Sequence, residues 1–279
     1  MDTLRLDGRL LAAQIQEELK SEIQSLPHQP HLVVLFVGAN PASTLYVNMK
    51  KKVADKVGIK TTVHDFDEKI STEKLINFIN TLNVDSSVDG ILVQLPLPDH
   101  IDTNAVIEAI LPSKDVDGLT SKNQGGMMTG YSTLLPCTPL GCLRLIHQAR
   151  TNLTGLNAVV VGRSRLVGRP MAQLLLNEDC TVAQAHSYTQ NLMELCSKAD
   201  ILVSATGVQG LIKRNFVKEG AIVIDVGISK TADGHIAGDV DAESVLGRAG
   251  WLTPVPGGVG PMTVAMLMSN MVNIVKHSF

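Results

Sequence analysis

The stretch AVVVGRSRLVGRPMAQLLL, residues 158–176, decides the fold because it has the pattern of a buried strand that turns sharply into a helix. Its apolar run ends at Gly162, which would let the chain turn tightly, and Gly168 would let the helix begin close to a ligand. Pro170 suits the first turn of a helix, where no backbone N–H is needed. A glycine turn before a helix N-terminus presents backbone N–H groups to a phosphate, so this turn is a candidate dinucleotide site.

The glycines do not match the G-x-G-x-x-G fingerprint, so an ordinary strand-to-helix connection with solvated arginines remains an open alternative. The next expected strand, 180–185, bears on which dinucleotide would fit. An NAD site typically has an acid after that strand to bind the ribose 2′-OH, whereas here HSYT follows. Arg163 and Arg165 lie in the turn itself. The missing acid and the nearby arginines favour a 2′-phosphate and therefore NADP.

Apolar runs alternate with helical patterns along most of the chain, which indicates α/β folding with buried parallel strands. A loop-rich stretch at 121–141 separates two such runs. The sequence therefore predicts a first domain over 1–120 and a second, Rossmann-like domain over 121–261. We expect a C-terminal helix within 262–279 to pack back on the first domain. The expected strands are 31–38, 59–66, 90–95, 157–162, 180–185, 199–205 and 220–227.

The composition is that of a folded globular protein and points away from two classes of partner. Of 279 residues, 44% are hydrophobic and 18% charged, and the net charge of −3 gives no electrostatic reason to expect nucleic acid. The apolar stretch 262–275 is broken by Ser and Asn and is shorter than the ~20 residues that span a bilayer. The N-terminus lacks the pattern of a signal peptide. Without a C-x-x-C pair or H-E-x-x-H, we expect a cytoplasmic protein with free thiols and no metal.

The segment 40–58, NPASTLYVNMKKKVADKVG, has helical spacing that places Tyr46 and Lys50 on one face. An ammonium group lowers the pKa of a neighbouring phenol, and partial burial lowers that of the lysine, so the pair could transfer protons near neutral pH. The alternative is that Lys50, Lys51 and Lys52 form a solvated face. Tyr-x-x-x-Lys also occurs in short-chain dehydrogenases, but there it follows the cofactor turn, and here it precedes the turn.

Two further places gather polar groups near expected strand ends. Gln94 closes the run GILVQ, and open α/β sheets bind ligands at the carboxyl ends of strands, although a turn-capping role fits as well. KDVDG, residues 114–118, sets two carboxylates before a glycine, which fits either an Asx-type turn or a substrate contact. It makes no metal site without further ligands.

Motifs occur from one end of the chain to the other: VGANPAS, YVNMK, DGILVQLPLP, KDVDG, PCTPLG, VVVGRSRLVGRP, DVGI, GDVD and PVPGGVGPMTVAML. Together they resemble the bifunctional methylenetetrahydrofolate dehydrogenase/cyclohydrolase family, known in bacteria as FolD. The resemblance implies two α/β domains around a cleft, the second an NAD(P)-binding domain, usually in a homodimer. It also implies that NADP oxidises 5,10-methylenetetrahydrofolate to 5,10-methenyltetrahydrofolate, which water then converts to 10-formyltetrahydrofolate.

By the same resemblance, Lys50 is the catalytic lysine, Tyr46 stacks on the folate and orients it, and Gln94 supports the lysine. Asp117, grouped with the catalytic residues, would hold the pterin ring, and Ser43 would line the same site. On the cofactor side the resemblance implies contacts from Gly162, Arg163, Ser164, Ser187, Ile228, Thr138 and Thr263, the two threonines near the nicotinamide.

The chain departs from the family pattern at a few positions, and at the one that bears on the cofactor, Tyr188 stands where Arg or Lys is common. This removes one phosphate partner and leaves NAD usable beside NADP. Two other interpretations stay open: a two-domain dehydrogenase of the shikimate or amino-acid type, and a non-catalytic nucleotide-binding regulator. Only the folate enzyme would turn over methylenetetrahydrofolate.

Overall fold

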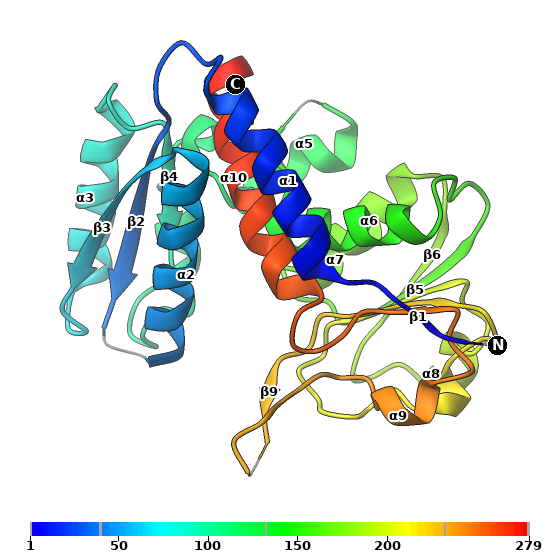
Figure 1. Cartoon of the computed structure of the whole chain (residues 1–279). Coiled ribbons are helices and arrows are strands. Elements are labelled where there is room, and N and C mark those ends of the chain that lie inside the picture. The colour runs from blue at the N-terminus through cyan, green and yellow to red at the C-terminus, as the bar shows by residue number, and fades with distance from the viewer. Residues whose placement is uncertain (1, 39–40, 132, 232, 278–279) are drawn as a thin grey trace. The chain divides into compact units, whose positions relative to one another are not determined.

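The computed structural model describes residues 2–38, 41–131, 133–231 and 233–277, without the side chains of residues 41–43 (Figure 1). By internal contacts the chain forms two compact units, Met1–Ala12 with Pro136–Thr263 and Ala13–Leu135 with Val264–Phe279. We call them the six-stranded unit and the three-stranded unit, after their parallel sheets. None of the described helices combines the length and apolar character that a bilayer span requires.

The three-stranded unit has its first strand in the middle of the sheet. The order is β3 (Lys60–Phe66), β2 (His31–Val37), β4 (Gly90–Val93), and both pairings are parallel. The sequence of β2, HLVVLFV, is apolar at nearly every position because the strand is buried on both faces. In Figure 1, α2 (Pro41–Val57) and α3 (Thr72–Val84) are the connections that follow β2 and β3.

Helices cover both faces of this sheet. On one face, Leu75 and Ile79 of α3 pack with Leu35 of β2. On the other, Gly90 of β4 lies so close to Met271 that a Cβ at residue 90 would overlap the methionine sulfur. Met271 belongs to α10, Val259–His277, so the C-terminal helix packs on this sheet.

The unit contains further helices, of which α1 (Gly8–Ile23) contacts α10. An ion pair between Glu22 and Lys276 joins α1 to α10, which lie side by side (Figure 1). The other elements are α4 (Thr103–Glu108), the 3-10 turn η1 (Pro112–Lys114) and α5 (Ser121–Thr129).

The six-stranded unit has a parallel sheet in the order β1-β11-β8-β7-β5-β6. Its strands are β1 (Leu4–Arg5), β5 (Asn157–Val161), β6 (Thr181–Ala185), β7 (Ile201–Ser204), β8 (Ile222–Asp225) and β11 (Trp251–Leu252). An antiparallel pair, β9 (Ser229–Lys230) and β10 (Ile236–Ala237), stands apart from it. The helices are α6 (Cys137–Ala149), α7 (Gly168–Asn177), α8 (Leu192–Cys196), α9 (Ala242–Val245) and the 3-10 turn η2 (Arg214–Phe216). The predicted α/β class is confirmed, and β1, β9, β10 and β11 are additions to the predicted strands.

Both sheets share a topological feature that marks ligand sites. β2 lies between β3 and β4, and β5 lies between β6 and β7, so in each sheet the chain moves first to one side and then to the other. Open α/β sheets bind ligands beyond the carboxyl ends of the strands at such a switch point. Ligand sites are therefore expected at the ends of β2 and β4 and at the ends of β5 and β7.

Candidate functional site

A buried lysine meets an amide at the carboxyl end of β4. Gln94 follows β4 directly, Lys50 lies on α2, and the two residues are 9% and 8% exposed. Lys50 Nζ donates to Gln94 Oε1 at 3.0 Å, while Gln94 Nε2 donates to the Leu95 carbonyl at 2.6 Å. The second bond turns the amide oxygen toward the lysine. The alternative of a solvated face is wrong for Lys50, although Lys51 and Lys52 are exposed.

Tyr46 lies one helical turn before Lys50 and is half-buried. Burial raises the pKa of its phenol above the ordinary 10.0, because the phenolate loses more hydration than the neutral form. The predicted lowering of this pKa by the ammonium group is wrong, since desolvation is the stronger effect here. Tyr46 is therefore a neutral hydrogen-bond donor near neutral pH. Ser43 lies in the first turn of α2, and its side chain is outside the described part of the chain.

The two acids of KDVDG have different surroundings. Asp115 is 1% exposed, and its Oδ2 accepts from Thr120 N at 2.7 Å and from Asn123 Nδ2 at 2.9 Å. Burial raises the pKa of this carboxyl, and its hydrogen bonds anchor the turn into α5. Asp117 is half-buried and makes no hydrogen bond or ion pair with the described residues. Of the two acids, Asp117 is the one with a carboxylate available to a ligand.

A short backbone pairing fixes where Asp117 lies. Asp115 pairs in parallel with Ile91 of β4, so the chain beyond it runs toward the carboxyl end of β4, the end that carries Gln94. The structure thus brings Lys50 and Gln94 into contact and places Asp117 toward the same end of the three-stranded sheet. This is the switch point of that sheet, where a ligand site is expected.

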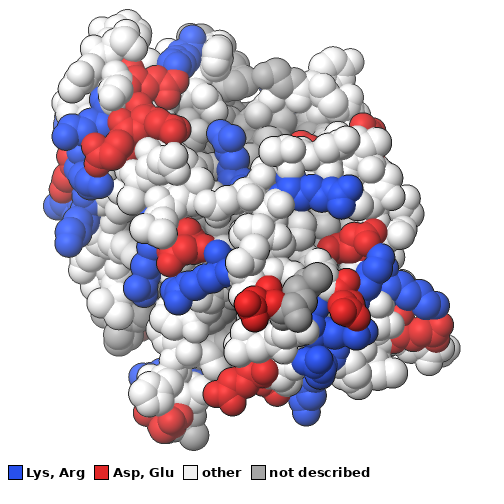
Figure 2. Space-filling view, turned by 45° about the vertical axis from the view of Figure 1, so that its right-hand side comes forward, with Lys and Arg blue, Asp and Glu red and all other residues white. Residues whose placement is uncertain are grey.

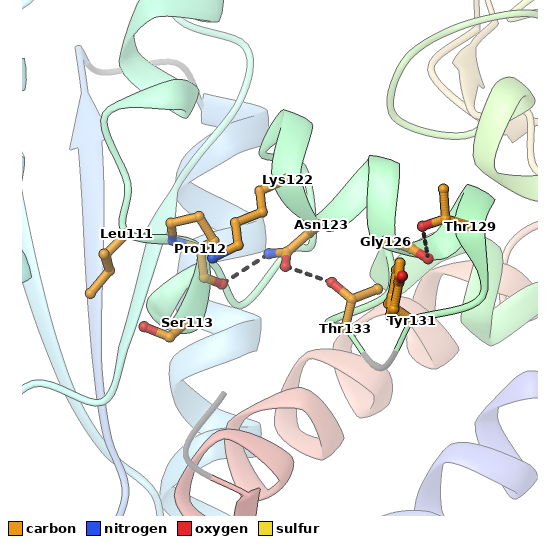
Figure 3. Close-up of a pocket in the computed structure, with 9 residues that line it drawn as sticks. All are labelled: Leu111, Pro112, Ser113, Lys122, Asn123, Gly126, Thr129, Tyr131 and Thr133. Atoms are coloured by element: carbon orange, nitrogen blue, oxygen red, sulfur yellow. Dashed lines mark hydrogen bonds between the residues drawn. The ribbon is translucent and has the colours of Figure 1, made fainter.

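A cavity of about 550 Å³ lies beside α5 (Figure 3). In its wall, Asn123 Nδ2 donates to the Pro112 carbonyl at 2.9 Å, and its Oδ1 accepts from Thr133 Oγ1 at 2.6 Å. With its second amide proton on Asp115, this amide has no donor left for a ligand. None of the predicted site residues lines the cavity, and it supports no site. The lining residues are Leu111, Pro112, Ser113, Lys122, Asn123, Gly126, Thr129, Tyr131 and Thr133.

The turn between β5 and α7 requires both of its glycines. Gly162 has a φ of +133°, and a Cβ there would lie 3.0 Å from the carbonyl carbon of Ala205, just after β7. A Cβ on Gly168 would overlap the carbonyl oxygen of Gly162. The N-terminus of α7 therefore stands against the end of β5, at the switch point of the six-stranded sheet, which fits a bound dinucleotide. Ser164 Oγ accepts from Val167 N at 3.2 Å and helps to close the turn.

Three residues predicted to bear on the 2′-phosphate lie at neighbouring strand ends. β5 and β6 pair in parallel through Val161 and Ala185, so Arg163 and Ser187 both follow the same edge of the sheet. Both side chains are exposed. The guanidinium carbon of Arg163 lies 5.7 Å from the ring centroid of Tyr188, the residue after Ser187.

The other predicted cofactor residues belong to the same unit. Ile228 follows β8 and is 52% exposed, beyond the carboxyl end of that strand. Thr138 and Thr263 are distant in sequence, but their hydroxyl oxygens lie 3.0 Å apart. The structure therefore brings the two threonines together as a pair of polar groups and leaves the isoleucine side chain open to solvent.

Sequence reasoning missed a pair of buried acids at the end of β8. Asp225 is 4% exposed and accepts from the backbone N–H groups of Gly227, Asp239 and Val240 at 2.9–3.0 Å. Asp239 is fully buried and accepts from Ser204 Oγ at 3.0 Å. Burial, with the neighbouring Asp239, raises the pKa of Asp225 to about 6. The sequence does place a glycine close to each of these acids, Gly227 in DVG and Gly238 in GDVD, and this pattern could have indicated them.

Charge and metal-ligating groups add no further site. Figure 2 shows Lys and Arg side chains interspersed with Asp and Glu on the face in view, and not gathered into one basic field. Within the described ranges, no group of three His, Cys, Asp or Glu side chains is arranged to hold a metal ion. The free and buried cysteines are Cys137, Cys142, Cys180 and Cys196.

Comparison with known proteins agrees with this geometry. The chain matches the tetrahydrofolate dehydrogenase/cyclohydrolase catalytic domain over residues 6–117 and the NAD(P)-binding domain of the same family over residues 136–279. It is 48% identical to the bifunctional protein FolD of Campylobacter curvus, over 98% of this chain and 96% of that one.

Two solved structures are similar over nearly their whole length. The bifunctional enzyme FolD from Campylobacter jejuni has a TM-score of 0.97 and 47% identity, covering 99% of this chain and 100% of that one. The Trypanosoma brucei enzyme, solved with NADP cofactor and inhibitor, has a TM-score of 0.94 and 35% identity, covering 100% and 99%. From its sequence and its fold, the chain belongs to the tetrahydrofolate dehydrogenase/cyclohydrolase family.

Proposed function

We propose that Lys50 and Gln94 carry the cyclohydrolase chemistry and that the turn after β5 binds NADP. The protein is a bifunctional methylenetetrahydrofolate dehydrogenase and methenyltetrahydrofolate cyclohydrolase of one-carbon folate metabolism, with an NAD(P)-binding domain. The predicted membership of this family is thereby confirmed. The observation that carries the residue assignment is the buried hydrogen bond between Lys50 and Gln94.

In the dehydrogenase step, a bound nicotinamide cofactor accepts a hydride from the methylene bridge of the folate. The lone pairs of N5 and N10 stabilise the cation that remains, so the task of the chain is to position the folate and to exclude water. The Asp117 carboxylate can accept two charge-assisted hydrogen bonds from the N–H groups of the pterin. The half-buried ring of Tyr46 can stack on the folate, and Ser43 would line the same site.

In the cyclohydrolase step, water adds to the methenyl carbon, a carbonyl forms there, and the bond from that carbon to N5 breaks. The water gives up both protons, of which N5 takes one and solvent receives the other. A group beside the reacting carbon must therefore accept and return a proton. Lys50 suits this role because Gln94 Oε1 holds its Nζ in one place. Tyr46 can donate a hydrogen bond to the water or the folate, since burial raises its pKa.

Selection of NADP over NAD would rest on Arg163 and Ser187. The guanidinium group of Arg163 can bind a 2′-phosphate through two parallel hydrogen bonds, and the Ser187 hydroxyl can donate a third. No acid stands after β6 to repel the phosphate. With one cation at the phosphate, we expect NAD to be used as well, less efficiently. The other assigned cofactor contacts are Gly162, Ser164, Ile228, Thr138 and Thr263.

A turnover assay tests the function directly. Purified protein is mixed with methylenetetrahydrofolate and either NADP or NAD, and the absorbance of the methenyl compound is followed. It should appear faster with NADP than with NAD and then decay as the compound is hydrolysed. A dehydrogenase of the shikimate or amino-acid type would leave methylenetetrahydrofolate unchanged, and a regulator would bind the cofactor without turnover. Either outcome would contradict the proposal.

We further infer a homodimer that works in the cytoplasm. β6 lies at one end of the strand order of its sheet, and such an edge can pair with a second copy. The free thiols of the four cysteines suit a reducing compartment. Sedimentation equilibrium checks the dimer, because a mass equal to the 29.9 kDa of one chain would contradict it.

A further inference from the structure

Tyr188 is a large aromatic residue that the fold leaves almost entirely in solvent. It is 79% exposed, so its ring contributes nothing to a core. Its ring instead faces the guanidinium group of Arg163, with 5.7 Å between the guanidinium carbon and the ring centroid. This distance is within the range of a cation–π contact. The two residues come from different turns, one after β5 and the other after β6.

The turn that carries Tyr188 is held closed by its own hydrogen bonds. His186 N donates to Thr189 Oγ1 at 2.8 Å, and Thr189 N donates to the His186 carbonyl at 2.8 Å. Tyr188 N donates to His186 Nδ1 at 3.2 Å, and the two rings meet edge to face at 6.1 Å. The hydrogen bonds fix the backbone of the turn, and the His186 ring lies beside the Tyr188 ring, while the arginine is a long side chain with many rotamers.

The geometry of a guanidinium group lets it make both kinds of contact at once. Its flat face binds an aromatic ring, and its edge carries the N–H groups that form parallel hydrogen bonds with a phosphate. Stacking on Tyr188 restricts Arg163 before a ligand arrives, so less conformational entropy is lost when the phosphate binds. The edge of the guanidinium group remains available beside the Ser187 hydroxyl.

We propose that Tyr188 is a positioning residue, which holds Arg163 in the orientation that binds the 2′-phosphate of NADP. Tyr188 thereby supports NADP preference at a position where it offers no positive charge of its own. The inference rests on the proposed function, in which the turn after β5 binds the dinucleotide and Arg163 binds the 2′-phosphate.

The test compares Tyr188→Ala and Tyr188→Phe in the full-length enzyme, with KM and kcat measured for NADP and for NAD. Tyr188→Ala should raise the KM for NADP by about two- to fivefold, as expected for an exposed cation–π contact. The kcat and the KM for NAD should not change. Tyr188→Phe keeps the aromatic face and should behave as the wild type. Tyr131→Ala is the matched control, because Tyr131 is 76% exposed and outside the cofactor unit.

A double-mutant cycle separates this inference from the proposed function. If Tyr188 acts through Arg163, then Arg163→Ala and the double variant should have the same KM for NADP. Additive losses, or an equal rise in KM for both cofactors in Tyr188→Ala, would overturn the inference, because Tyr188 would then act on the nucleotide directly. A different result would contradict the proposed function: Arg163→Ala alone would raise the KM for NADP and the KM for NAD equally.

Discussion

Lys50 is the single residue on which the hydrolysis of methenyltetrahydrofolate should depend most. Lys50→Met keeps the length of the side chain and removes the group that carries protons, so the hydrolysis rate should fall by about a hundredfold or more. Hydride transfer needs no proton from Lys50, and part of the dehydrogenase activity should survive. The decay of methenyl absorbance measures the first activity, and its formation with NADP measures the second.

Lys51→Met is the matched control for this change. Lys51 is the next residue of α2 and is exposed, so its replacement should leave hydrolysis at the wild-type rate. Wild-type hydrolysis by Lys50→Met would contradict the assigned role. An equal loss in both variants would show that the positive charge of the helix matters, and not the buried amine.

Substitution of the two acids of KDVDG should have different effects: loss of Asp117 should weaken folate binding, and loss of Asp115 should lower stability. Asp117 makes no hydrogen bond to the described residues, so Asp117→Ala should change the free energy of unfolding by less than about 0.5 kcal/mol. Its KM for methylenetetrahydrofolate should rise at least about ten- to a hundredfold, because the loss of even one of its two charge-assisted hydrogen bonds to the pterin has an effect of that size. The KM for NADP should stay the same.

Asp115→Ala is the structural counterpart of that variant. It leaves Thr120 N and the Asn123 amide without their acceptor, so it should lower the free energy of unfolding by about 1–3 kcal/mol. Urea unfolding of both variants makes the comparison. If Asp117→Ala is destabilised as much as Asp115→Ala, then Asp117 is a turn residue and not a folate contact.

Burial decides which residue-level predictions succeed. Helical spacing correctly placed Tyr46 and Lys50 on one helix, but it could not show that Lys50 alone of three adjacent lysines is buried. The buried amine bonds to Gln94, which follows β4 and is 44 residues away in the chain. The predicted lowering of the Tyr46 pKa was wrong for a similar reason. Helical spacing shows which charged residue is a neighbour, but it does not show how far burial desolvates the phenol.

At the scale of elements, the turn between β5 and α7 should control which cofactor is used. Arg163 is the cation assigned to the 2′-phosphate, and a charge-assisted hydrogen bond contributes about 1.5–3 kcal/mol. Arg163→Ala should therefore raise the KM for NADP about ten- to a hundredfold and barely change the KM for NAD. Initial rates of methenyl formation with each cofactor measure both. An equal rise for the two cofactors would mean that Arg163 shapes the turn.

Long strands could be predicted from the sequence, and very short ones could not. β2, β3, β5 and β6 have five to seven residues, among them β-branched ones, and each was predicted within a residue or so of its bounds. β1 and β11 have two residues each, which is too few for any periodicity to register. They pair with each other although one is near the N-terminus and the other far along the chain, and only the tertiary fold provides that pairing.

At the scale of the whole molecule, the sequence predicted two α/β units but not the order of their strands. Alternating apolar runs and helical patterns require parallel strands, whereas strand order depends on the side to which each connection crosses. In the three-stranded sheet β3 and β4 flank β2, and in the six-stranded sheet β6 and β7 flank β5. This order puts Gln94 and Gly162 each at a switch point, which explains why the predicted site residues cluster at strand ends.

The stability of the molecule should depend on pH through the buried carboxyl group of Asp225. Burial, together with the neighbouring Asp239, raises the pKa of Asp225 from 3.8 to about 6. An acid with a higher pKa in the folded state binds its proton more tightly there than in the unfolded chain. Its contribution to stability is therefore fully present below about pH 3.8 and is lost as the pH rises through about 6.

Asp225→Asn tests this linkage, because asparagine has a similar shape and does not titrate. A pKa difference of about two units corresponds to about 3 kcal/mol. Between about pH 4 and pH 7, the free energy of unfolding of the wild type should fall by up to that amount relative to the variant. Urea unfolding of both proteins across this range gives the difference, in which the titration of acids distant from Asp225 cancels. If the difference is constant with pH, the folded protein does not raise the pKa of Asp225, and the buried acid has no part in the pH dependence of stability.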